Sequence, residues 1–183
     1  MRADQVRELV AQRSKGAIPG LGDKLLTTLL WAQIKAESEF DEYAISPAGA
    51  KGLAQFTDST WSQFGQGSPF DPEEAIKAQI GYMKYLYARF PEIPHHLERW
   101  QFALAAYNTG VTNINSMLAY AREACGVPRL HEDWKAGGAA PGDWQRWEYA
   151  SQHLGKATGS AAQETLTYVQ RVMRFAMGGE EPE

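Results

Sequence analysis

The sequence has one cysteine, no long apolar run and no excess of positive charge. With only Cys125, the chain cannot form an intramolecular disulfide. No run approaches the roughly 18 apolar residues that span a bilayer, so we expect no stable membrane insertion. The net charge of -4 argues against nucleic acid or an anionic membrane surface as the main partner, because both favour clustered lysine and arginine.

The N-terminus also lacks the features of a secretory signal. Residues 1–16 carry charges throughout and contain no apolar core segment. We therefore expect a protein that is made in the cytoplasm without a signal peptide. Any action outside the cytoplasm would then follow release by cell lysis, through a dedicated pore or from an injected particle.

Residues that would support metal or nucleophile chemistry are sparse. His95 and His96 are adjacent, so on a helix they diverge by about 100° and do not easily share a metal. His131 and His153 have no Cys or His partner at ligand spacing, and Cys125 is predicted to be a small core residue. There is no G-x-S-x-G motif and no phosphate loop. We predict no metal and no cofactor.

Apolar residues recur with helical periodicity along most of the chain, and no segment has the alternation of a strand. The 183 residues, 44% of them hydrophobic, are enough for one domain with a real core. We predict an all-α fold, with residues 1–20 as an N-terminal helical extension, 21–179 as the main domain and 180–183 as a tail. The expected helices are 3–15, 23–36, a short one through Phe64, 72–90, 95–107, 112–124 and 160–177.

A carboxylate stands where the most apolar of these helices ends. The segment Leu25–Ala36 is followed by Glu37 and then by a polar loop. This loop continues into the compact run 49–55, GAKGLAQ. An acid on a buried helix that faces an open loop suits general acid catalysis. An isolated glutamate in this position is more often an ordinary helix end, so the surrounding pattern decides the interpretation.

Three short blocks supply that pattern. The first holds Glu37-Ser38, Ser46-Pro47 and residues 49–55; the second is AAYNTG at 105–110, and the third is ETLTYV at 164–169. Together and in this order they resemble the soluble lytic transglycosylases, glycoside hydrolase family 23. The blocks extend from Glu37 to Val169, nearly the whole chain.

The resemblance implies a lysozyme-like α-helical domain around a glycan-binding cleft. It also implies cleavage of the β-1,4 bond between N-acetylmuramic acid and N-acetylglucosamine in the glycan strands of peptidoglycan. Such enzymes use one glutamate and no water, and leave a 1,6-anhydro ring on the muramic acid. This differs from the usual scheme, in which a second carboxylate activates water or forms a covalent bond.

Carried over from the family, Glu37 is the acid and then the base of the reaction. Ser46 matches a serine whose hydroxyl lies near the catalytic carboxylate. Tyr168 matches a tyrosine whose hydroxyl orients that carboxylate. The residues expected to contact glycan are Gln55, Tyr107 and Asn108.

Four neighbouring residues have structural interpretations. Glu39 lies two positions after Glu37 and would face elsewhere on a helix, so we expect it at the surface. Ser38 is predicted to be structural. Gly49 and Gly52 are predicted to serve the turn through positive φ or a close backbone approach.

The chain departs from the family pattern at several points. Ala54 and Thr57-Asp58 stand where the family usually has Met and Met-Pro, which removes apolar surface from the cleft floor, and Leu166 replaces a frequent Arg. The second and third blocks are separated by an unusually long stretch, whose irregular part is 129–159. We expect its tryptophans to anchor this segment rather than to bind glycan: Trp134, Trp144 and Trp147.

Two other functions stay open. A goose-type-like lysozyme would hydrolyse the same bond with a second carboxylate, and nothing in their spacing selects among Asp41, Asp58 and Asp71. A catalytically silent glycan-binding or structural module is the other alternative, although it would have no need of Glu37 and its supports. The preferred prediction is a monomeric bacteriophage endolysin or virion-associated lysin that acts on the cell wall in the periplasm and is bacteriolytic.

Overall fold

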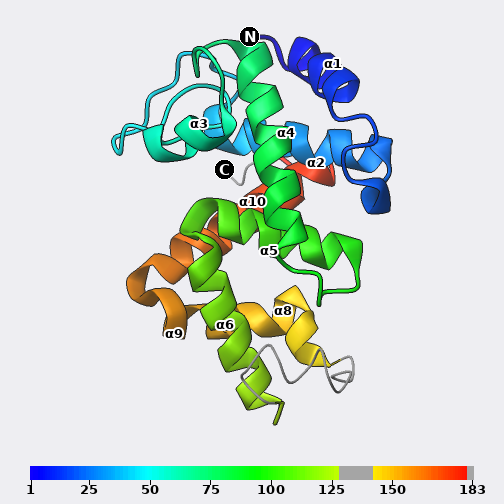
Figure 1. Cartoon of the computed structure of the whole chain (residues 1–183), viewed down its shortest axis with the longest axis vertical. Helices are drawn as coiled ribbons and strands as arrows, with labels where there is room; N and C mark the ends of the chain where they lie inside the picture. The colour runs from blue at the N-terminus through cyan, green and yellow to red at the C-terminus, as the bar shows by residue number, and fades with distance from the viewer. Residues whose placement is uncertain (128–141, 181–183) are drawn as a thin grey trace. The chain divides into compact units, whose positions relative to one another are not determined.

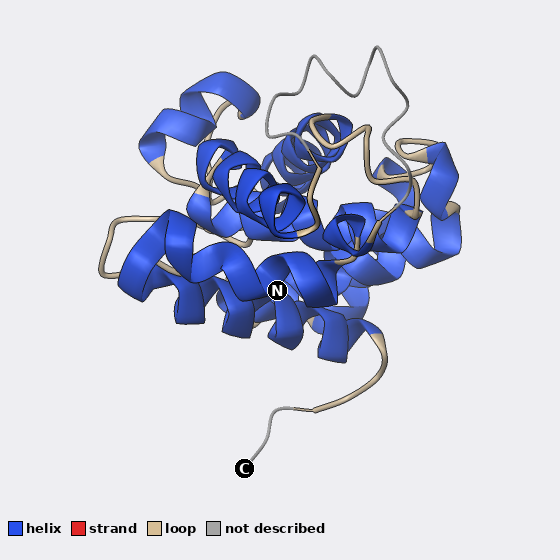
Figure 2. Ribbon diagram, turned by 90° about the horizontal axis from the view of Figure 1, so that it is seen from below, coloured by secondary structure: helices blue, strands red, loops and turns tan. Residues whose placement is uncertain are grey.

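The computed structural model describes residues 1–127 and 142–180. Within these residues the chain forms α-helices and short 3-10 turns, and Figure 2 shows helices and loops without a strand. The only β-type pairings among them are two isolated antiparallel bridges, Ile45 with Lys51 and Lys51 with Phe56. The predicted all-α class is confirmed.

The structure divides into two compact units, Met1–Tyr85 with Gln170–Glu183, and Leu86–Val169. We refer to them as unit 1 and unit 2. The boundaries fall inside two helices, α4 (Pro72–Ala88) and α10 (Ala162–Ala176). Each unit has a buried core of its own, so each is described by itself.

Unit 1 is built around helix α2, the apolar helix expected from the sequence. Its elements are α1 (Ala3–Arg13), the 3-10 turn η1 (Pro19–Leu21), α2 (Asp23–Ser38), α3 (Asp58–Phe64), most of α4 and the end of α10 (Figure 1). Helix α2 buries Leu26, Leu29, Leu30 and Ile34 almost completely. Helix α1 packs on α2. The core therefore fixes α2 along most of its length.

Two helices of unit 1 begin at the caps that the sequence indicates. The hydroxyl of Thr57 accepts a hydrogen bond from the Thr60 amide at the start of α3. Asp71 Oδ1 accepts from the amides of Glu73 and Glu74, and Pro72 is the first residue of α4. Both arrangements satisfy amides that have no partner within the helix.

Two buried glutamines, one on α2 and one on α4, lie in the core of unit 1. Gln79 Nε2 donates to the Leu30 carbonyl at 3.1 Å and to Gln33 Oε1 at 2.9 Å, and both glutamine side chains are fully buried. Buried amides are tolerated when they are hydrogen-bonded in this way. The pair links α4 to α2 one turn before Glu37.

Unit 2 is also helical. Its elements are the end of α4, α5 (His96–Thr109), α6 (Val111–Ala124), η2 (Asp143–Gln145), α8 (Trp147–Ala150), η3 (Ser151–His153), α9 (Leu154–Thr158), η4 (Gly159–Ala161) and the start of α10. Helix α6 packs on α5 and on α9. The core of this unit contains Trp100, Phe102, Leu118 and Leu154.

Several local predictions for unit 2 need correction. Helix α5 extends two residues beyond the predicted end at Tyr107. It includes Asn108 and Thr109 and stops before Gly110. Helix α10 begins at Ala162, after the 3-10 turn η4, and not at residue 160. Cys125 is exposed rather than buried, because it follows the last residue of α6, Ala124, outside the helix.

The described part of the tryptophan-rich segment is more regular than expected, since residues 143–161 form short helical turns. Trp144 and Trp147 are buried, and Trp147 meets Phe102 edge to face with 5.4 Å between ring centroids. Their burial agrees with the anchoring role. Trp134 and His131 lie outside the described residues.

Candidate active site

A cavity of about 570 Å³ opens in unit 1 where α2 ends. This volume lies in the range of small-molecule binding sites. The residues that matter for its chemistry are Glu37, Asp41, Ile45, Ser46, Gln55 and Arg171. They come from three parts of the chain: the last turn of α2, the loop 39–55 and the C-terminal half of α10.

Glu37 lies in the last turn of α2 and is half-buried. The helix extends two residues beyond the predicted end, to Ser38, so helical backbone holds Glu37. Glu39 then takes a left-handed conformation (φ 52°) and its amide donates to the Lys35 carbonyl at 3.1 Å. Ser38 Oγ donates to the Leu53 carbonyl at 2.8 Å, which ties the helix end to the loop and gives Ser38 the structural role expected of it.

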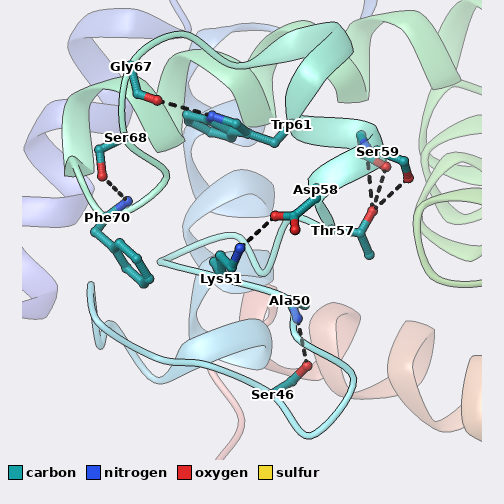
Figure 3. A network of polar contacts seen from close by, with 11 residues as sticks. Ser46, Ala50, Lys51, Thr57, Asp58, Ser59, Trp61, Gly67, Ser68 and Phe70 are labelled. Carbon is teal, nitrogen blue, oxygen red and sulfur yellow. Dashed lines mark hydrogen bonds and ion pairs between the residues drawn. The ribbon is translucent and has the colours of Figure 1, made fainter.

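Ser46 also lines this cavity. Its amide donates to the Ala50 carbonyl at 2.9 Å, and its Oγ accepts from the Ala50 amide at 3.0 Å (Figure 3). The hydroxyl oxygen is therefore held in place by the turn. The hydroxyl proton remains to be donated into the cavity.

The turn that follows depends on two glycines with positive φ, Gly49 (82°) and Gly52 (73°). A Cβ on Gly52 would lie 2.0 Å from the backbone oxygen of Pro69, whereas one on Gly49 would meet nothing within 4 Å. The prediction of positive φ is confirmed at both glycines, and that of a close approach at Gly52. Lys51 pairs with Asp58 at 2.7 Å across the loop (Figure 3).

Gln55 also has a left-handed backbone, with φ 50°. Its Nε2 donates to the carbonyls of Gly52 at 2.9 Å and Ala44 at 3.3 Å. The amide nitrogen thus holds the two sides of the loop together. Its Oε1 is the polar atom that the side chain can offer to a ligand.

Arg171 is a cavity residue that the sequence analysis did not identify. Its Nη1 donates to the Ala36 carbonyl at 3.1 Å, and its Nη2 lies 3.5 Å from Glu39 Oε1. The guanidinium therefore caps the end of α2 beside Glu37. The sequence does not indicate this role, because Arg171 and Arg174 both lie on α10 and their spacing does not show which of them reaches the cavity.

The structure separates the three aspartates considered as a second carboxylate. Asp41 lines the cavity, and its Oδ1 accepts from the Tyr43 amide at 2.9 Å. Asp58 is paired with Lys51, and Asp71 caps α4. Glu39 also borders the cavity, but its side chain is 75% exposed, in agreement with its predicted surface position.

The three remaining predicted site residues belong to unit 2. Tyr107 and Asn108 lie in the last turn of α5, and Tyr168 lies on α10. Asn108 Oδ1 accepts from Thr165 Oγ1 at 2.7 Å, which joins the second sequence block to the third. The structure thus brings Glu37, Ser46 and Gln55 to one cavity in unit 1, and Asn108 to the third block in unit 2.

The described histidines show no metal-binding arrangement. His96 Nδ1 is hydrogen-bonded to the hydroxyl of Tyr87. Within residues 1–127 and 142–180, no group of three or more His, Cys, Asp or Glu side chains is placed to hold a metal ion.

Comparison with known proteins identifies the fold family. Residues 20–126, more than half of the chain, match the family described as "Transglycosylase SLT domain". Similar relatives include the "Membrane-bound lytic murein transglycosylase F" of three bacteria. That of Alcanivorax borkumensis is 38% identical over 58% of this chain and 23% of its own length. Those of Desulfosudis oleivorans and Cronobacter sakazakii are 32% and 31% identical over 80% and 85% of this chain, and 31% and 30% of their own length.

The predicted location is wrong in the light of these relatives. We expected a protein made in the cytoplasm without an export signal and released afterwards, but the relatives are named as membrane-bound. None of the helices in the described ranges is both long and apolar enough to cross a bilayer. The chain spans less than a third of each of these relatives, so its charged first residues were no sound basis for a location.

The match extends over the end of α2, the glycine turn and the whole of α5, and therefore over the first two sequence blocks. It agrees with the helical fold and with the residues gathered at the cavity of unit 1. The chain belongs to the transglycosylase SLT domain family.

Proposed function

We propose that this domain is a peptidoglycan lytic transglycosylase with Glu37 as its single acid and base. It cleaves the β-1,4 bond between N-acetylmuramic acid and N-acetylglucosamine and leaves 1,6-anhydro ends. The observation that carries the proposal is Glu37 itself, half-buried at the end of α2, in a cavity that Ser46 also lines. Family membership and the names of the relatives support the same reaction.

The proposed chemistry needs two proton transfers at one carboxyl group. Glu37 donates its proton to the glycosidic oxygen as the bond from C1 of the muramic acid breaks. The resulting carboxylate takes the proton of the C6 hydroxyl of the same sugar, and O6 bonds to C1. The acid is regenerated and no water is consumed, as general acid and base catalysis by one group requires.

The other predicted residues have supporting roles in this proposal. Ser46 donates its hydroxyl proton to the reacting groups, and Gln55 offers Oε1 to the glycan. Tyr107 and Asn108 bind glycan, and Tyr168 orients the acid. These last three roles rest on the sequence blocks of the family.

A second candidate function is hydrolysis of the same bond. Asp41 favours it, because this carboxylate lines the same cavity as Glu37. An aspartate in this position could activate a water, as in inverting glycosidases. Against this, Asp41 already accepts the Tyr43 amide and so has a structural task in the loop.

Mass spectrometry of muropeptides released from purified peptidoglycan separates these functions. Products with anhydro-muramic ends, one water lighter than hydrolysed ones, are expected from the wild type and from Asp41→Asn. Reducing muramic ends that disappear in Asp41→Asn would establish the hydrolase. Glycan binding without any product, from walls of several chemotypes, would indicate a silent binding module.

We propose further that the protein acts as a monomer and not on nucleic acid, in line with its net charge of -4. The narrower assignment to a bacteriophage endolysin or virion-associated lysin also stays a proposal. A bacteriolytic enzyme should clear a suspension of cells whose outer membrane has been permeabilised. Muropeptide release without clearing would contradict the lysin assignment and leave the transglycosylase in place.

A further inference from the structure

Two large apolar side chains stand out into solvent on the loop that borders the cavity. Tyr43 is 70% exposed and Ile45 is 64% exposed. The loop alternates, because residues 41, 43 and 45 are exposed while 42, 44 and 46 are half-buried. Single exposed apolar residues are common on protein surfaces, so exposure alone is a weak argument. Three further observations concern how this pair is held and where it lies.

The backbone beneath the pair is tied down on both sides. The Tyr43 amide donates to Asp41 Oδ1 at 2.9 Å. The Ala44 carbonyl accepts from the Gly52 amide at 2.9 Å and from Gln55 Nε2 at 3.3 Å. Ile45 forms the antiparallel bridge with Lys51. The two side chains are therefore presented from a preorganised backbone, which lowers the entropy cost of binding.

A second aromatic ring lies beside Tyr43. The ring of Phe70 is 6.3 Å from that of Tyr43 at an interplanar angle of 30°. Ser68 Oγ accepts from the Phe70 amide at 3.2 Å, which fixes the Phe70 backbone (Figure 3). The ring contact restricts the orientations of Tyr43 and supplies further apolar surface next to it.

The pair is continuous with the candidate active site. Ile45 itself lines the cavity, and the next residue is Ser46. A ligand whose reacting bond lies at Glu37 thus meets Ile45 within the cavity, and Tyr43, two residues earlier on the exposed side of the loop, extends the apolar surface. We call Tyr43 and Ile45 the apolar ledge.

We propose that the apolar ledge is a sugar subsite, which binds the apolar face of an N-acetylated pyranose ring next to the bond that is cleaved. The inference rests on the proposed function. A pyranose presents a face of C–H bonds that packs on an aromatic ring, and its acetamido methyl group suits an aliphatic side chain such as Ile45. Both contacts remove apolar surface from water.

The charges around the ledge favour a neutral sugar over a stem peptide. The carboxylates of Glu37, Glu39 and Asp41 line the same cavity and outnumber the one cation that lines it, Arg171, whose Nη2 lies 3.5 Å from Glu39 Oε1. Stem peptides carry carboxylates of their own, which these side chains would repel. An N-acetylglucosamine ring carries no charge and is unaffected. The occupant we infer is therefore the glycan strand and not its peptide.

The test measures binding rather than turnover, with Glu37→Gln as the common background so that no substrate is consumed. The probe is the hexamer of N-acetylglucosamine, titrated by calorimetry. Tyr43→Ala should weaken binding about fivefold or more, in keeping with the loss of one aromatic contact. Tyr43→Phe keeps the ring and should bind as the background does.

Leu25→Ala is the matched control. Leu25 is also an exposed apolar residue of unit 1, at 42%, but it lies twelve residues before Glu37, about 18 Å along the helix. Its replacement should leave the affinity unchanged. Melting temperatures of all four proteins are recorded, and Tyr43→Ala should melt close to the background because its side chain is mostly in water.

Three results would overturn the inference: no binding of the hexamer, equal binding by Tyr43→Ala, or weaker binding by Tyr43→Ala only to peptide-bearing muropeptides. The last would assign the ledge to the stem peptide. Muropeptide release by the wild type, measured in parallel, tests the proposed function separately. Wild-type cleavage with an unaffected Tyr43→Ala titration rejects the ledge alone, whereas ledge-dependent binding without cleavage rejects the enzyme alone.

Discussion

The two walls of the cavity in unit 1 are built in different ways. Helix α2 owes its position to apolar side chains that are buried along most of its length, and Glu37 lies in its last turn. The loop 41–56 has almost no regular structure, and hydrogen bonds, two glycines and the left-handed Gln55 define its course. One wall is fixed by packing and the other by backbone conformation.

This difference predicts how each wall responds to substitution. A change of chemistry in the last turn of α2 should leave the structure intact, because the core holds the helix from behind. A change of backbone preference in the loop should alter the structure itself, because hydrogen bonds and left-handed residues set its course and its buried side chains, Leu53, Ala54 and Phe56, all lie at its end. The predictions below test this division, beginning with the largest expected effect.

Glu37→Gln should reduce cleavage of peptidoglycan by about a thousandfold or more. Glutamine keeps the size of the side chain but cannot supply the proton, and general acid–base groups typically contribute about 10²- to 10⁴-fold. The measurement is muropeptide release, with circular dichroism and melting temperature as controls for the fold. Substantial residual cleavage, or a large drop in melting temperature, would contradict the division between the walls.

Gly52→Ala should destabilise the protein by more than about 3 kcal/mol. The new Cβ would overlap the Pro69 carbonyl oxygen, and a left-handed residue other than glycine already costs about 1–2 kcal/mol. Gly49→Ala is the matched control, because its φ is also positive but its Cβ would meet open space. Denaturant unfolding of the two variants should differ by the cost of the overlap, and equal losses would refute the close approach.

Gln79→Leu should destabilise the protein by about 1–3 kcal/mol, because it removes the donor to the Leu30 carbonyl and to Gln33 Oε1. This change tests how far α2 depends on polar contacts, because its support in the core is partly polar. Gln12→Leu, on the exposed surface of α1, should change stability by less than about 0.5 kcal/mol. Equal effects in urea unfolding would show that the buried pair contributes nothing.

The smallest effect should come from charges remote from both walls. The hydrogen bond from Lys77 and the nearby guanidinium of Arg13 lower the pKa of Glu73 below its ordinary value of 4.5. Because the folded pKa is the lower one, the stabilisation is present above 4.5 and is lost as the pH falls through the folded value. Glu73→Gln should lower the melting temperature slightly at neutral pH and not at all in strong acid. A large change would mean that the surface pair supports the fold.

The same division explains what the sequence could predict. Helix α2 was expected because apolar residues such as Leu26, Leu30 and Ile34 repeat with helical spacing, and these three side chains are buried. Thr57 and Asp71 are residue types that commonly cap helices, and the structure has them at the starts of α3 and α4. The positive φ of Gly49 and Gly52 was expected because glycine alone adopts it without strain.

Contacts between distant residues were beyond the reach of periodicity. Arg171 lies more than 130 residues from the α2 carbonyl that it caps. Gln33 and Gln79 pair inside the core, at positions where a pattern of apolar residues shows only interruptions. Asp41 could not be chosen over Asp58 and Asp71 until the loop placed it in the cavity. In each case the missing quantity was a through-space distance.

The hydrogen bond between Asn108 and Thr165 has a consequence for how the chain can change. It joins the two ends of the segment of unit 2 between residues 108 and 165. The second and third sequence blocks therefore keep their register whatever the length of this segment. Loop-closure entropy rises only by about 0.6 kcal/mol for each doubling of loop length. The loops of this segment can therefore be lengthened at little thermodynamic cost, whereas its helices, which bury Leu118 and Leu154, must stay intact.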